Sequence, residues 1–170
     1  MKQEFSAAIQ PAYDLWNSLR ADRPYPKFSD LEPETLGKLA EHAILLTVLA
    51  NDDDQEPDFL FLAVGSHLAE RFGPGLYRSR VSQLDDLVLR KTLLTRYRKV
   101  FASGEPVYGK GDRELDKLPY SYEALTMPLG NAETGQVTHL LGVAIYYTLQ
   151  QYRALFGKDR VGENETLAPQ

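Results

Sequence analysis

The stretch DFLFLAVGSHLAERFGPGLYRSRV, residues 58–81, passes from an apolar run directly into a short helical segment flanked by glycines. An apolar run of about eight residues bounded by turn residues predicts a strand. The glycines of this stretch fit neither G-x-G-x-x-G nor a loop that ends in Gly-Lys-Ser/Thr, so the common nucleotide-binding loops are not indicated. The stretch therefore predicts a strand that reverses tightly into a helix.

The residues before this strand predict its partner. A second apolar run, AILLTVLA at 43–50, is separated from the first by the acidic turn NDDDQEP, and this pattern predicts a β-hairpin. At 59–64 both sets of alternate residues are apolar, as they are at 140–147 in the last predicted strand, QVTHLLGVAIYYTL at 136–149. Because an antiparallel sheet with one wet face carries polar residues at every second position, we expect both faces of this sheet to be covered.

The first twenty residues indicate what covers one of these faces. Apolar residues recur there at spacings of three and four, and Pro11 either starts the predicted helix or kinks it. This N-terminal helix, or a dimer interface with a second subunit, is expected to cover one face of the sheet. The candidates for that contact are Ile9, Tyr13, Trp16 and Leu19.

A longer helix is expected at about 84–103, on the other face of the sheet. Ser82 and Asp85 have the spacing of a capping box, and Gly104 supplies the stop. The basic residues of this helix, which include Arg96, are expected to form a solvated surface.

Two further extended segments complete the sheet, EPVYGKGDREL at 105–115 and YSYEALTMPLG at 120–130. The order of the elements predicts an α+β fold with a five-stranded antiparallel sheet and helices on one face. We expect a single domain over residues 11–150. A partly helical segment at 1–10 would precede it, and a polar, partly disordered tail at 151–170 would follow it.

Composition excludes several classes of chemistry. The chain has 170 residues, a net charge of −5 and no cysteine, which rules out disulfides, thiolate metal sites and a cysteinyl-flavin adduct. The negative charge opposes binding to nucleic acid or to anionic membranes. The N-terminal residues lack the pattern of a signal peptide, and no run approaches the ~18 apolar residues of a membrane span. A cytoplasmic protein without nucleic-acid or membrane partners is expected.

Motifs in three parts of the chain carry a resemblance to a known family. They are LWNSLRADRPYPKFSDLEPETLGKLAEHAILLTV at 15–48, AVGSHLAERFG at 63–73 and the proline of TMPLG, Pro128. In this order they resemble a bacterial PAS-like family that is best known from alphaproteobacteria, over about residues 12–149. The matching positions of the first motif are Trp16, Arg20, Pro26, Asp30 and Pro33.

The resemblance implies a stand-alone sensory and regulatory module. The chain shows no kinase histidine box, no GGDEF-like or EAL-like signature and no helix-turn-helix pattern, so we expect output through a signalling protein partner in trans. A small molecule in a cavity would gate that interaction. A homodimer is expected, and enzyme activity is not. The candidate ligand-pocket residues are Phe61, His67, Phe72, Tyr97, Met127 and Tyr146, for which ordinary core packing is the competing interpretation.

The sequence leaves the cofactor and two other functions open. Haem ligation through His67 is not favoured, because a lone histidine beside a helix start is commonly a surface residue. The histidines at 42, 67 and 139 lack H-x-x-x-H or H-E-x-x-H spacing, so no metal site is indicated. One alternative function is a small hotdog-like or cone-like enzyme or carrier that acts on an acyl or aromatic ligand. The other is a dimerisation module without a ligand.

Overall fold

The computed structural model describes residues 4–50, 56–115, 118–157 and 166–167. At its centre lies an antiparallel six-stranded sheet with the strand order β2-β1-β5-β4-β3-β6. The strands are β1 (Ala43–Leu49), β2 (Asp58–Val64), β3 (Val107–Leu115), β4 (Leu118–Asn131), β5 (Gln136–Tyr147) and β6 (Thr166–Leu167). The predicted α+β class and the five predicted strands are confirmed, and β6 adds a two-residue edge beside β3.

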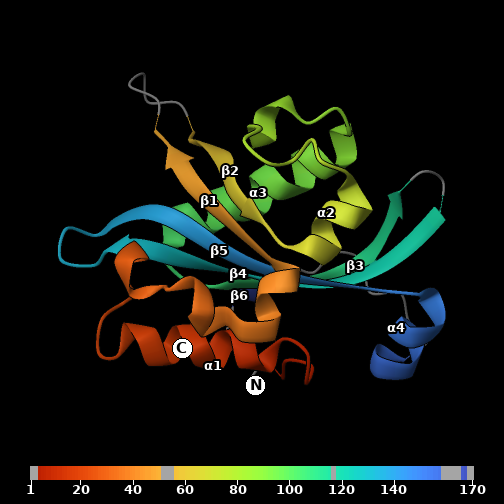
Figure 1. Cartoon of the computed structure of the whole chain (residues 1–170), viewed down its shortest axis with the longest axis horizontal. Coiled ribbons are helices and arrows are strands. Elements are labelled where there is room, and N and C mark those ends of the chain that lie inside the picture. Colours follow the sequence, from red (N-terminus) through yellow and green to blue (C-terminus); the bar gives the residue numbers. More distant parts are fainter. Residues whose placement is uncertain (1–3, 51–55, 116–117, 158–165, 168–170) are drawn as a thin grey trace.

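The helices lie on both sides of this sheet. They are α1 (Gln10–Arg20), η1 (Phe28–Asp30), η2 (Pro33–His42), α2 (Ser66–Phe72), η3 (Val81–Gln83), α3 (Leu87–Ser103) and α4 (Leu149–Phe156). Figure 1 shows α2 and α3 above the sheet and α1 below it, with α4 below the far end of β5. The hotdog-like alternative is wrong, because β1 and β2 precede α2 and α3 while the remaining strands follow them, and in the described residues the sheet does not wrap one central helix.

Helix α1 provides the cover that the sequence predicts for the lower face. The helix begins at Gln10 with Pro11 in its first turn, where the missing N–H of proline breaks no helical hydrogen bond. Ile9 and Trp16 are fully or almost fully buried, whereas Tyr13 and Leu19 are half-buried. Helix α1 of this chain therefore covers part of the lower face.

The start of α3 differs from the sequence prediction. The helix begins at Leu87, and its N-terminal cap is Asp86, whose carboxylate accepts a hydrogen bond from the backbone N–H of Leu89 at 2.9 Å. The expected capping box at Ser82 and Asp85 is wrong, because the Ser82 hydroxyl instead donates to Asp58 of β2. A second difference is Arg96, which is 2% exposed and faces the sheet rather than water.

The reversal from β2 into α2 depends on Gly65. Its backbone N–H donates to the carbonyl of Ala43 at 2.7 Å, and a Cβ at this position would lie 2.3 Å from the carbonyl oxygen of Ala40. No side chain fits there, so glycine allows the start of α2 to sit directly on the end of η2. This close approach places the first turn of α2 beside the end of η2.

Candidate functional site

A cavity of about 40 Å³ lies between the upper face of the sheet and helices α2 and α3. Its floor is formed by four small residues on β4 and β5: Ala124, Thr126, Gly142 and Ala144. They face upward because side chains alternate along a strand, and they leave space because none of them fills the distance to the helices. The cavity therefore follows from small residues at every second position of two neighbouring strands.

Aromatic side chains form the walls of the cavity. Phe61 of β2, Phe72 of α2, Tyr97 of α3 and Tyr146 of β5 all line it, which are four of the six residues predicted from the sequence. The rings of Phe72 and Tyr146 meet edge-to-face with their centroids 5.5 Å apart, so part of this aromatic surface is occupied by contacts within the protein.

The remaining two predicted pocket residues lie elsewhere. Met127 is fully buried on the lower face of the sheet. Side chains alternate along β4, and Met127 directly follows Thr126, whose side chain points up into the cavity. His67 lies on the outer side of α2 and is exposed, and it does not line the cavity. These two placements correct the predicted pocket.

One cationic side chain lines this otherwise apolar cavity. The guanidinium of Arg96 donates to the hydroxyl of Tyr122 at 3.1 Å, and it lies 5.5 Å from the centre of the Tyr122 ring. A buried cation requires compensating acceptors or an anion, because desolvation of a charge is costly. The cavity wall thus presents aromatic surface together with one positive group.

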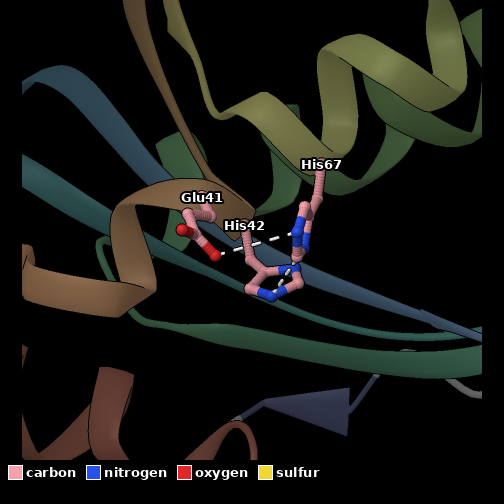
Figure 2. Close-up of side chains that lie close together, drawn as sticks. All are labelled: Glu41, His42 and His67. Atoms are coloured by element: carbon pink, nitrogen blue, oxygen red, sulfur yellow. Dashed lines mark hydrogen bonds and ion pairs between the residues drawn. The ribbon is translucent and has the colours of Figure 1, made fainter.

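Outside the cavity, two histidines that are distant in the sequence lie together. Figure 2 shows Glu41 and His42 at the end of η2 and His67 at the start of α2, with their side chains directed toward one another. Nδ1 of His67 is 3.0 Å from Nε2 of His42, and Nε2 of His67 is 3.7 Å from a carboxylate oxygen of Glu41. Burial lowers the pKa of His42, and the charge of His67 lowers it further. The sequence analysis missed this cluster because only the contact of α2 with η2 creates it.

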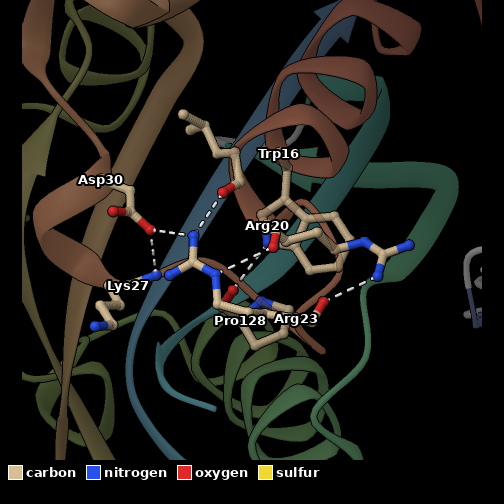
Figure 3. A network of polar contacts seen from close by, with 7 residues as sticks. Trp16, Arg20, Arg23, Lys27, Asp30 and Pro128 are labelled. Carbon is tan, nitrogen blue, oxygen red and sulfur yellow. Dashed lines mark hydrogen bonds and ion pairs between the residues drawn. The ribbon is translucent and has the colours of Figure 1, made fainter. Parts of the chain in front are cut away.

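The family-like motif at 15–48 serves the lower face of the sheet. The indole N–H of Trp16 donates to the carbonyl of Pro128 at 2.9 Å, which fixes α1 to β4 (Figure 3). Arg23 and Asp30 form an ion pair at 2.6 Å, and the backbone N–H of Lys27 also donates to Asp30. The hydrogen bond from Lys27 and the neighbouring Arg23 lower the pKa of Asp30. These matching positions hold the N-terminal region in place.

A wider surface cleft of about 550 Å³ borders the same motif. Arg20 and Arg23 both line it, but each is engaged by the protein: Arg20 lies over the Trp16 ring and donates to the carbonyl of Arg23, and Arg23 pairs with Asp30. The arginines of this cleft therefore serve to hold the loop after α1. The apolar cavity above the sheet is the better candidate for a ligand site.

A carboxylate that no sequence pattern predicts is buried on the lower face. Glu123 is 0% exposed and accepts hydrogen bonds from the hydroxyls of Tyr108 and Tyr147, at 2.8 and 3.0 Å, and from the backbone N–H and hydroxyl of Ser6. Burial raises the pKa of Tyr108, and burial and the charge of Glu123 raise the pKa of Tyr147 to about 12. This network joins the residues before α1 to β3, β4 and β5.

Comparison with known proteins identifies the architecture. A family model described as a PAS domain matches residues 4–145. The PAS domain of BvgS from Bordetella pertussis superposes with a TM-score of 0.51 at 15% identity, over 71% of this chain and 90% of that one. The VqmA dimer from Vibrio cholerae gives a TM-score of 0.48 at 10% identity, over 71% of this chain. This chain spans about half of the VqmA chain, 54% of its length.

No curated protein matches the sequence. In the part of the chain that the structure describes, no helix is both long and apolar enough to cross a membrane.

Proposed function

The chain belongs to the PAS domain family of sensory and regulatory modules, and we propose that it senses a small organic anion in the cavity between the sheet, α2 and α3. The observation that supports this most directly is Arg96, a cation that is 2% exposed in the wall of an apolar cavity. A carboxylate with a short apolar body complements both parts of this wall.

The size of the cavity restricts the ligand. A volume of about 40 Å³ holds a few small groups, whereas pockets for drug-sized ligands measure roughly 300–1,000 Å³. A larger ligand therefore requires α2 to move outward, because the sheet and the long helix α3 form the rest of the wall. Helix α2 is short, with seven residues, and only Leu68 of it is buried, so it is the wall element held by the least apolar contact.

The output that we propose is a change in the surface presented to a signalling protein partner in trans. A ligand shifts a protein toward the conformation that the ligand binds more tightly. A ligand that fits only when α2 has moved outward therefore stabilises that conformation. The exposed outer side of α2 then changes position relative to η2. A homodimer is part of this proposal, and light scattering of the full chain at micromolar concentration tests it.

A matched pair of ligands tests the anion site. Carboxylates of three to seven carbons are titrated into the full chain by calorimetry, each beside its uncharged amide, with wild type and Arg96→Met. We expect the wild type to prefer a carboxylate over its amide by about tenfold or more, and Arg96→Met to lose that preference. If no carboxylate binds the wild type, or if the preference persists in Arg96→Met, the proposal is wrong.

Circular dichroism must show that Arg96→Met folds. Should it fail, Arg96→Lys keeps the charge and removes only the planar guanidinium, and the same pairs of ligands are compared. A carboxylate preference that falls in Arg96→Lys, because the two-pronged guanidinium contact is lost, then assigns the anion to this position, whereas a preference equal to that of the wild type contradicts it.

A further inference from the structure

We propose that Glu41, His42 and His67 form a binding site for a divalent transition-metal ion of the zinc class. One donor atom from each of the three side chains lies within 4.8 Å of the others. Two imidazole nitrogens and one carboxylate oxygen are a donor set that zinc accepts, with a fourth position left for water. This site is separate from the cavity, since none of its three residues lines the cavity wall.

The two imidazoles already stand near the separation that a metal requires. Bonds of about 2.0–2.1 Å in tetrahedral geometry place two ligand nitrogens about 3.3 Å apart. Nδ1 of His67 and Nε2 of His42 are 3.0 Å apart, with the rings at 75° to each other. Opening this pair by a few tenths of an ångström converts a hydrogen bond between the rings into a pair of ligands.

Glu41 must move farther than the histidines, and it is free to do so. The side chains of Glu41 and His67 are 56% and 50% exposed, so their rotation disturbs no core packing. Glu41 is adjacent to His42 in the chain and already lies 3.7 Å from the His67 ring. A rotation of its side chain brings a carboxylate oxygen to the metal, and the exposure of the site gives the ion a path of entry.

The electrostatics of the cluster favour one bound metal ion over protonation of both imidazoles. Metal binding requires neutral imidazole, and the proximity of the two rings disfavours a positive charge on both. Glu41 supplies the negative charge. The three side chains therefore place two nitrogen donors and one carboxylate around a single point.

The placement of the cluster depends on the fold and not on a local motif. His42 ends η2 and His67 lies in the first turn of α2, 25 residues apart in the chain. Gly65 brings them together, because a Cβ there would collide with the carbonyl oxygens of Ala40 and Glu41. A bound ion would thus cross-link α2 to η2 close to the backbone approach at Gly65.

The test uses the full chain without an affinity tag, stripped with a chelator and titrated with Zn²⁺ by calorimetry and with Co²⁺ by visible absorption. We expect one ion per chain, and the Co²⁺ spectrum should show the intense bands of four-coordination. His67→Gln and His42→Gln should each weaken binding by about 100-fold, and Glu41→Gln by about tenfold or more.

The chain offers its own control for this titration. His139 is the third and last histidine of the sequence, and its ring stacks on Phe28 with centroids 4.0 Å apart, on another part of the surface. His139→Gln should leave Zn²⁺ binding unchanged. The proposal fails if the wild type binds Zn²⁺ no more tightly than the double variant His42→Gln/His67→Gln, or if His139→Gln loses as much affinity as His67→Gln. Because His67 is exposed, its variant keeps the test valid even if His42→Gln does not fold.

Discussion

The two faces of the sheet are built from the same strands and serve opposite purposes. On the lower face β4 and β5 carry large residues, such as Leu125, Met127 and Leu141, which are fully or almost fully buried. On the upper face the intervening positions include Ala124 and Gly142, and a cavity remains. Dense packing of side chains stabilises the fold, whereas a cavity between side chains can hold a ligand. The lower face therefore stabilises a fold whose upper face stays underpacked.

The polar groups follow the same division. The lower face buries Glu123 among donors supplied by the chain itself, so its charge is compensated internally. The upper face buries Arg96 in the cavity wall, where its guanidinium donates to the hydroxyl of Tyr122. Variants that affect one face and spare the other test this division.

The largest effect is expected from Trp16→Ala on the lower face. The indole is 3% exposed and donates the hydrogen bond to Pro128, so its removal leaves both a void and a carbonyl without its donor. The free energy of unfolding should fall by about 3–5 kcal/mol. Urea denaturation followed by circular dichroism measures this. Tyr77→Ala is the control, because Tyr77 is 54% exposed, and its loss should change stability by less than ~0.5 kcal/mol.

A smaller loss is expected from Glu123→Ala. The substitution leaves the hydroxyls of Tyr108 and Tyr147 without their buried acceptor, at a cost of about 2–3 kcal/mol. Thermal unfolding of the variant at pH 7 measures the loss. An unchanged melting temperature would show that water replaces the carboxylate and that the network contributes little.

The same network predicts how stability depends on alkaline pH. Unfolded tyrosine releases its proton near pH 10, about its ordinary pKa, while Tyr147 in the folded chain holds its proton to about 12. Between these values the folded state binds more protons, so stability falls as the pH rises from about 10 to 12. Tyr147→Phe should flatten part of this slope. If the stability of Tyr147→Phe depends on pH between 9 and 12 as that of the wild type does, the raised pKa of Tyr147 is not the cause of the slope.

The smallest effect on stability is expected on the upper face. Ala124→Val adds two methyl groups to the cavity floor, and stability should change by less than about 1 kcal/mol because space is available. Binding of any cavity ligand should be lost in the same variant. The neighbouring change Leu125→Ala sharpens the comparison: it opens a void on the dense face and should lower stability by about 2–5 kcal/mol. Equal costs for the two variants would contradict the division between the faces.

The sequence was sufficient for the sheet and insufficient for several side chains. Apolar residues at every position of 59–64 predicted two covered faces, and the helical stripe around Trp16 predicted one of the covers. Met127 was predicted to line the pocket. Side chains alternate between the two faces of a strand, and when both faces are apolar the sequence does not show which face a given residue occupies. Arg96 was expected in water because charged helix residues are mostly solvated, and only its contact with Tyr122 shows otherwise.

Contacts between distant residues were beyond the sequence. His42 and His67 are 25 residues apart, and their approach depends on a backbone contact at Gly65 that no spacing rule describes. Glu123 lies in a strand whose neighbouring residues are apolar, and its hydrogen-bond donors come from positions as far away as Ser6. Spacing rules detect chemistry within one element, so a site assembled from several elements becomes visible only in the fold.

The hydrogen bonds from Ser6 to Glu123 have a practical consequence for anyone who shortens or fuses this chain. The donors come from a residue before the first helix, although a boundary drawn from the helical pattern alone would fall at residue 11. A fragment that starts there keeps all but the first residue of α1, yet it removes both Ser6 donors and leaves the buried Glu123 with the hydroxyls of Tyr108 and Tyr147. Fusion partners and truncation points at this end therefore belong upstream of residue 6, and a crystallisation fragment should retain it.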